Sequence, residues 1–177
     1  MDCNPELIAA AQNNTAKLGF SDRFVLHTGE LADTRFLENL RMEASPVQLV
    51  MANPPWRLVG SGRLPATEAR RKALFGDKGT FPLFASAASS LLEEDGRFAC
   101  IISPDRLQDM LAALDGVGLT PYLLQYIHKQ KTSPATFVLI EARKGAHAKP
   151  SVAEPIALYG PERFFTLESL AFCPFLR

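Results

Sequence analysis

The stretch that decides the fold is residues 47–56, Val-Gln-Leu-Val-Met-Ala-Asn-Pro-Pro-Trp. Its first six residues form a near-continuous apolar run, which is typical of a strand buried in a parallel sheet. The strand then ends in Asn53, Pro54, Pro55 and Trp56. These four residues bring an amide side chain, a free main-chain carbonyl and a flat ring into one small space. The sequence therefore predicts a binding site for a planar group that carries an NH2.

Helices and strands alternate on both sides of this stretch. The expected helices run from Asn4 to about Gly19, over residues 34–42, about 66–75 and 81–94, and from the cap at residues 103–105 to Gly116 or Gly118. The expected strands are residues 23–28, 47–52, 97–103, 121–129 and 135–144, and residues 53–65 read as a loop. The last two strands are too close in sequence for a crossover helix, so they should pair antiparallel. The pattern predicts an α/β sheet, mostly parallel with a reversed edge strand.

The bulk composition sets limits on the protein class. The chain has 177 residues, the size of one domain, and 19 basic residues balance 19 acidic ones. Composition alone therefore gives no sign of a nucleic-acid partner. The three cysteines form no CxxC pair, and the three histidines share no metal-ligand spacing. We therefore expect no disulfide framework, no metal, no membrane span, no signal peptide and a cytoplasmic location.

Five stretches resemble one enzyme family. They are residues 1–7 (MDCNPEL), 27–30 (HTGE), 52–56 (ANPPW), 92–98 (LEEDGRF), and 133–135 with 138–145 (SPA, VLIEARKG). Together they resemble the class I, S-adenosylmethionine-dependent methyltransferases. Within that class they are most similar to the small-domain group that contains the bacterial tRNA1(Val) adenine-37 N6-methyltransferases.

The resemblance implies a Rossmann-like sheet with an antiparallel C-terminal hairpin. It implies a partial catalytic domain over residues 1–145 and an extension over 146–177 that packs on the same domain. The family's first strand and glycine-rich loop, which approach the cofactor closely, are missing from the chain. We therefore expect either an N-terminally truncated fragment of a longer protein or a degenerate copy.

The proposed catalytic residues are Asn53, Pro54, Pro55 and Trp56. The Asn53 side-chain oxygen and the Pro54 carbonyl would hold the two N–H groups of an amine. Pre-proline stiffness keeps this main chain extended, and neither proline has an N–H that competes. Trp56 would stack on the target base; the alternative is a turn that ends the strand while Trp56 covers the core.

The resemblance implies S-adenosylmethionine as cofactor, with Asp2, Glu30 and Asn53 in contact with it. Asp2 would accept hydrogen bonds from the ribose hydroxyls, and Glu30 would lie near the cofactor's adenine amine. The alternatives are a terminal surface acid at Asp2 and a solvated loop charge at Glu30. A basic run after the motif could meet RNA phosphates, or form a solvated helix face: Arg57, Arg63, Arg70, Arg71 and Lys72.

Several functions remain open from the sequence. The first is N6-methylation of adenine in tRNA, which makes tRNA the expected partner. A second is methylation of a glutamine amide in a translation release factor, whose methyltransferases also use Asn-Pro-Pro and an aromatic residue. DNA adenine methylation is weaker, because no target-recognition domain is seen. A non-catalytic remnant is the fourth reading, and the oligomeric state is open.

Overall fold

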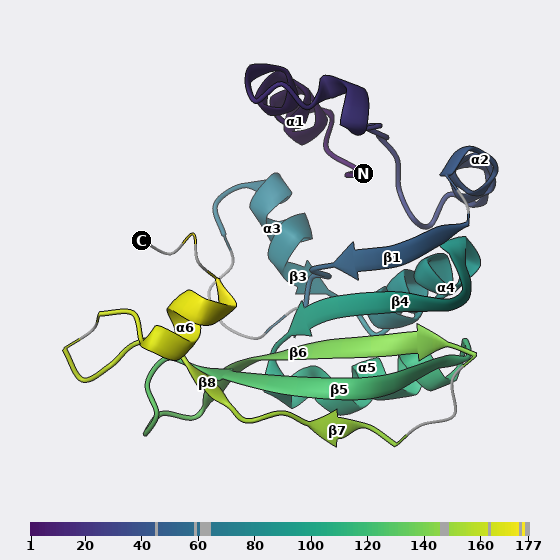
Figure 1. Ribbon diagram of the computed structural model, residues 1–177. Coiled ribbons are helices and arrows are strands. Elements are labelled where there is room, and N and C mark those ends of the chain that lie inside the picture. The colour runs from purple at the N-terminus through teal and green to yellow at the C-terminus, as the bar shows by residue number, and fades with distance from the viewer. Residues whose placement is uncertain are drawn as a thin grey trace. The chain divides into compact units, whose positions relative to one another are not determined.

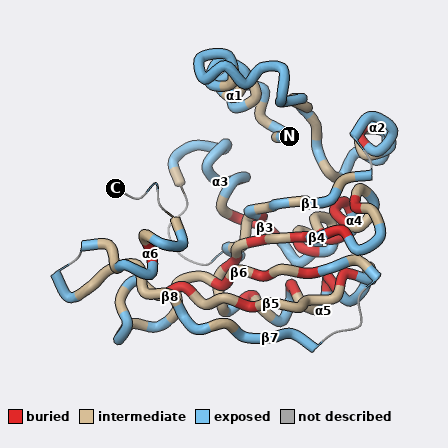
Figure 2. Tube along the Cα trace, in the orientation of Figure 1, coloured by how far each residue is buried: buried red, intermediate tan, exposed pale blue. Residues whose placement is uncertain are grey.

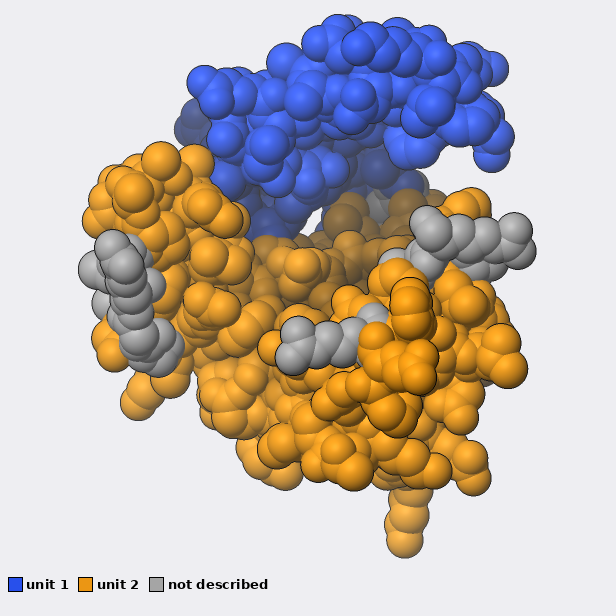
Figure 3. Space-filling model, turned by 90° about the vertical axis from the view of Figure 1, so that its left-hand side faces the viewer, with its two compact units in different colours: residues 1–45 blue, residues 46–177 orange. Residues whose placement is uncertain are grey.

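The computed structural model describes residues 1–44, 46–58, 60, 65–145, 149–162, 164–173 and 175. The chain divides into two compact units, unit 1 (Met1–Ser45) and unit 2 (Pro46–Arg177), coloured separately in Figure 3. Among the described residues, no helix is both long and apolar enough to cross a membrane.

The helices are α1 (Pro5–Lys17), a 3-10 turn η1 (Ser21–Arg23), α2 (Thr34–Ala44), α3 (Glu68–Leu74), α4 (Thr80–Leu91), a 3-10 turn η2 (Pro104–Arg106), α5 (Leu107–Asp115) and α6 (Leu167–Phe172). The strands are β1 (Val47–Ala52), β2 (Arg57–Leu58), β3 (Phe75–Gly76), β4 (Leu92–Ile102), β5 (Leu119–His128), β6 (Ala135–Lys144), β7 (Ser151–Val152) and β8 (Ile156–Ala157).

Unit 1 begins with the predicted helix start. The Asn4 side chain accepts the Glu6 N–H at 2.9 Å, and Pro5 occupies the first helical turn, where its missing N–H costs nothing. This expectation is confirmed. The strand predicted over residues 23–28 is wrong, since the segment forms one isolated parallel bridge, between Asp2 and Thr28. A single bridge forms because the chain turns into α1 soon after Asp2.

Unit 1 buries little of its surface. Leu40 of α2 is its one buried hydrophobic residue among those described, and α1 has none (Figure 2). Several apolar side chains of unit 1 are therefore exposed to solvent, among them Leu18 and Val25, which are 67% and 79% exposed.

Unit 2 is built on a mixed sheet in the order β1-β4-β6-β5-β7, with β8 also paired to β5, as far as the described residues show (Figure 1). β1 and β4 are parallel, while β6 runs antiparallel to both β4 and β5. The predicted hairpin of β5 and β6 is confirmed. The reversed strand, however, lies inside the sheet and not at its edge, because β6 pairs on both sides.

Helices α4 and α5 cover one face of this sheet (Figure 1). The core between them contains side chains with no more than 1% exposure: Phe81, Phe98, Ile102, Met110, Leu114, Val138 and Ile140. β1 is less buried than its apolar sequence predicts, since Leu49 and Met51 are 42% and 75% exposed. The reason is its place at the end of the sheet, where it pairs with β4 alone among the described strands.

The junction of α4 and β4 differs from the prediction. The helix ends at Leu91 and the strand begins at Leu92, five residues before the expected start at Arg97. The Lys144 ammonium donates to the carbonyls of Ser89 and Leu92, at 2.9 and 2.8 Å, and so satisfies the helix end. Helix and strand follow each other directly, but the continuous pairing of the strand begins at Arg97, after an irregular stretch in which Asp95 has a φ of 60°.

The rest of unit 2 adds short pairings. β2 lies inside the stretch predicted as loop and pairs in parallel with β3. β7 and β8 of the C-terminal segment pair with β5. The division into residues 1–145 and 146–177, and the missing first strand and loop, stay predictions.

Candidate active site

The Asn-Pro-Pro-Trp motif lies where β1 ends. The register pairs Ala52 with Cys100, so the loops after β1 and β4 leave the sheet at the same edge. Asn53 is exposed, whereas Pro54 is almost completely buried. Burial of the proline fixes the loop to the body of unit 2 and leaves the amide of Asn53 facing solvent.

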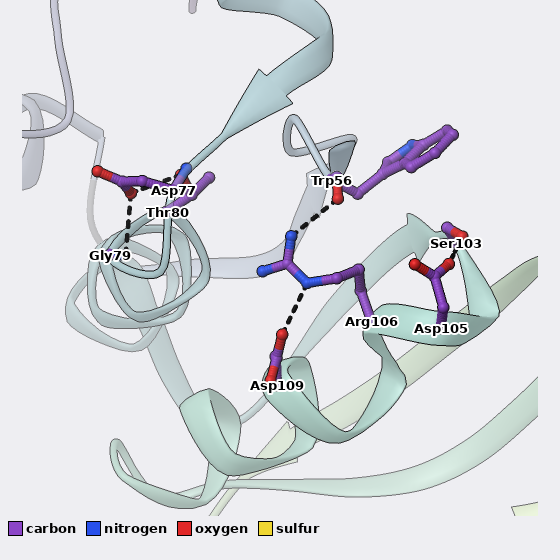
Figure 4. A network of polar contacts seen from close by, with 8 residues as sticks. All are labelled: Trp56, Asp77, Gly79, Thr80, Ser103, Asp105, Arg106 and Asp109. Atoms are coloured by element: carbon purple, nitrogen blue, oxygen red, sulfur yellow. Dashed lines mark hydrogen bonds and ion pairs between the residues drawn. The ribbon is translucent and has the colours of Figure 1, made fainter. Parts of the chain in front are cut away.

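The two loops enclose a hollow of about 240 Å³. One wall contains Trp56, Arg57 and Leu58, and the other contains Ser103 and Asp105. Figure 4 shows the indole of Trp56 on the same side as Ser103 and Asp105. The flat ring of Trp56 beside these polar groups could stack on a planar ligand.

Aromatic and charged groups surround the Trp56 ring. Phe137 of β6 meets it edge-on with ring centroids 6.2 Å apart, and the Arg57 guanidinium lies 5.2 Å from its centroid. On the opposite wall the Ser103 hydroxyl donates to the exposed carboxylate of Asp105. The hollow thus presents a stacking surface, a cation and an acceptor.

Gly76 of β3 packs closely against the motif. A Cβ atom at this position would lie 2.6 Å from the Pro55 carbonyl oxygen, a distance that real Cβ atoms do not adopt. A residue without a side chain is therefore required for β3 to approach the motif from this side.

Sequence reasoning missed the second wall of the hollow. Ser103 and Asp105 were interpreted only as a helix cap, but the Ser103 side chain makes no capping bond and binds Asp105 instead. Arg106, which donates to the Trp56 carbonyl, was not identified at all. The available signal was a polar turn directly after an apolar strand that is parallel to β1.

The basic candidates are only partly brought together. Arg57 lines the hollow, while Arg70, Arg71 and Lys72 lie on α3. Arg71 approaches Glu68 on the same helix at 3.9 Å. Arg63 lies outside the described residues.

Two cofactor candidates lie in unit 1. Asp2 pairs with Thr28, so Asp2 and the segment that ends in Glu30 are neighbours. One oxygen of the half-buried Asp2 carboxylate accepts the Asn4 N–H at 2.8 Å, and Glu30 is exposed. A carboxylate can accept further bonds, so Asp2 keeps capacity for a hydroxyl donor. Within the described ranges, no group of His, Cys, Asp or Glu residues could hold a metal ion.

The fold is shared with solved structures of other proteins. No protein-family model matches the chain. It resembles a predicted O-methyltransferase from Agrobacterium tumefaciens at a TM-score of 0.71 and 19% identity, over 98% of this chain and 73% of that one. It also resembles the fibrillarin pre-rRNA processing protein of Methanococcus jannaschii, with a TM-score of 0.53, 7% identity and coverage of 82% and 55%. The chain therefore has the Rossmann-like methyltransferase fold, as predicted.

Sequence comparison points to a particular relative. The chain is 32% identical over 112 residues to the tRNA1(Val) (adenine(37)-N6)-methyltransferase of Porphyromonas gingivalis, in strains ATCC 33277 and W83. The match covers 62% of this chain and 42% of the relative, so the chain spans less than half of that protein's length. The chain is therefore similar in sequence to these methyltransferases over part of their length.

Proposed function

We propose that the protein methylates the N6 amine of an adenine in tRNA, with S-adenosylmethionine as methyl donor. The observation that carries this proposal is the hollow that Trp56 lines, in the Asn-Pro-Pro-Trp motif that follows β1. The similarity to a tRNA adenine-N6-methyltransferase supports the choice of target.

The motif would hold the target amine in a reactive geometry. The amine of adenine is a poor nucleophile because its lone pair is delocalised into the ring. The Asn53 side-chain oxygen and the Pro54 carbonyl would each accept one of its N–H bonds and draw the nitrogen toward a tetrahedral shape. These bonds strengthen as the nitrogen becomes positive, so they stabilise the transition state more than the bound substrate. The cationic product then loses a proton to water.

The hollow would hold the base itself. Stacking on the Trp56 ring contributes about 1–3 kcal/mol per base, and Asp105 adds an acceptor on the opposite wall. A base in a structured tRNA must first leave its stack, and that costs a few kcal/mol. Phosphates that flank the base could meet Arg57 and the basic residues of α3, together with Arg63.

Two acids of unit 1 would hold the nucleoside part of the methyl donor. Asp2 offers a half-buried carboxylate with spare acceptor capacity, and Glu30 lies at the end of the neighbouring segment. These two acids would hold ribose hydroxyls and an adenine amine, and Asn53 would lie near the transferred group. When bound, S-adenosylmethionine supplies an electrophilic methyl group. The N6 lone pair forms the new C–N bond as the S–CH3 bond breaks, and S-adenosylhomocysteine leaves.

The test is mass spectrometry of tRNA nucleosides from cells with and without the gene. We expect N6-methyladenosine to fall in the deletion strain. The wild-type gene and the exposed-site control Asn13→Ala should restore it, and Asn53→Ala should not. Unchanged N6-methyladenosine in the deletion strain would contradict the proposal. A lost methylglutamine in a release factor would point to the amide reaction instead, and loss of neither would favour a non-catalytic remnant.

A further inference from the structure

A buried arginine lies directly behind the motif. Arg106, in η2 between β4 and α5, is 4% exposed. Among the described residues it is the one buried charged side chain. A guanidinium that leaves water is costly unless hydrogen bonds and opposite charge replace its hydration. Its partners therefore indicate its role.

Three groups fix the orientation of this side chain. Its Nε donates to Asp109 Oδ2 at 2.7 Å, its Nη1 donates to the Trp56 carbonyl at 2.8 Å, and its guanidinium carbon lies 4.5 Å from the Phe81 ring centroid. Figure 4 shows the guanidinium between Asp109 and the Trp56 main chain. The rigid fork of arginine can satisfy two acceptors in different directions at once, which the single ammonium of lysine cannot do in the same geometry.

The bond to Trp56 acts on the loop between β1 and β2. In this loop Pro54 and Pro55 have no N–H, so neither can donate a main-chain hydrogen bond. Gly76 packs against the Pro55 carbonyl from β3. Arg106 holds the next carbonyl, that of Trp56, from η2. The motif's main chain is thus closely packed at the Pro55 carbonyl and hydrogen-bonded at the Trp56 carbonyl.

The same arginine also joins the two walls of the hollow. It follows Asp105 directly in the chain, and it binds the main chain of Trp56 on the other wall. An ion pair with Asp109 alone would need no burial, because Asp109 is 60% exposed and one turn away on the same segment. The bond across 50 residues to Trp56 is what distinguishes Arg106 from an ordinary surface ion pair.

We propose that Arg106 is a positioning residue that holds Trp56 and the turn at Asp105 in place as the two walls of the hollow that receives the target base. The role of Arg106 in positioning a base rests on the proposed function. Its role in ordering Trp56 is independent of that function.

The test uses the fact that Trp56 is the only tryptophan of the chain, so intrinsic fluorescence reports on this loop alone. The variants are Arg106→Lys, which keeps the charge, and Arg106→Met, which removes it. The matched control is Arg143→Met, because Arg143 also lies over an aromatic ring, that of Tyr122 at 5.4 Å, away from the motif. Far-UV circular dichroism checks that each variant is folded.

We expect both Arg106 variants to raise the acrylamide quenching constant of Trp56 about twofold or more, since the fork geometry is lost in each. The control should leave quenching unchanged. Unchanged quenching in the folded Arg106 variants, an equal rise in Arg143→Met, or unfolding of both Arg106 variants would overturn the assignment. Unfolding counts because it would make Arg106 a general core residue.

A second measurement addresses catalysis. In methyl transfer to tRNA, Arg106→Lys should lower kcat by about 10–100-fold, because small displacements of a reacting group are costly, with an unchanged KM for S-adenosylmethionine. Rising quenching with an unaltered kcat would overturn the positioning of the base. If the wild-type protein transfers no methyl group to tRNA, the proposed function fails, while the quenching result still decides whether Arg106 orders Trp56.

Discussion

Unit 1 and unit 2 differ in how much apolar surface they bury. Unit 2 has a continuous core of side chains from both helices and the sheet, including Phe98, Leu114 and Ile140, which are fully buried. Unit 1 buries Leu40 and leaves Leu18 and Val25 in solvent. Because burial contributes about 25 cal/mol per Å² of apolar surface, the stabilising free energy is concentrated in unit 2. The proposed binding site for the target, the Asn-Pro-Pro-Trp motif, therefore lies in the well-packed unit 2. Asp2 and Glu30 lie in the weakly packed unit 1.

The largest expected contrast is in thiol reactivity. Cys3 in unit 1 is exposed, whereas burial in β4 raises the pKa of the Cys100 thiol to about 12. At pH 8 such a thiol is about one part in 10⁴ thiolate, and thiolate is the reactive form. Iodoacetamide should label Cys3 about 10³ times faster than Cys100, as measured by peptide mass spectrometry over time. Comparable rates for the two would show that unit 2 opens as easily as unit 1.

The next largest contrast is expected in the loss of unfolding free energy when a buried side chain of each unit is truncated. Ile140→Ala removes a fully buried side chain of β6 and should cost about 2–5 kcal/mol of unfolding free energy. Leu40→Ala should leave the main denaturant transition almost unchanged, because Leu40 lies in unit 1. Urea titration followed by Trp56 fluorescence measures both, since that signal comes from unit 2. An equal loss in the two variants would mean that the units unfold as one.

A smaller effect is expected at the close contact behind the motif. Gly76→Ala should destabilise unit 2 by about 1–3 kcal/mol, because its Cβ would displace the Pro55 carbonyl. Gly79→Ala is the matched control, since a Cβ there would lie 3.4 Å from the nearest atom, a side-chain oxygen of Asp77. Thermal unfolding compares the two variants. A larger loss in the control would argue against the tight contact.

The smallest effect is expected at the start of α1. Asn4→Ala removes the side-chain acceptor of the Glu6 N–H and should weaken the helix by about 1 kcal/mol. Hydrogen exchange should become faster within α1 while the amides of β4 and β6 keep their protection. Faster exchange in both regions would contradict the independence of unit 1.

The sequence predicted those helices, strands and turns that depend on residues close together in the chain. Asn4 and Pro5 marked the start of α1, and the short connection between β5 and β6 determined that they pair antiparallel. Asn53 to Trp56 could be recognised because the prolines and the aromatic ring follow an apolar strand directly.

The remaining features depend on distant partners. The place of β6 inside the sheet depends on its pairing with β4, which no local pattern encodes. Lys144 bonds to two carbonyls more than 50 residues away in the chain, and Arg106 reaches 50 residues back to Trp56. A basic residue in sequence is most often solvated, so its burial behind the motif was visible only in the structure.

The direct passage from α4 into β4 has a mechanical consequence. No residue separates Leu91 from Leu92, and the Lys144 ammonium bonds to a carbonyl on each side of this junction. The end of α4 and the start of β4 are therefore both fastened to β6. Ser103 and Asp105, one wall of the hollow, follow the other end of β4, so the strand that leads to this wall is anchored at its start by a side chain of its neighbour.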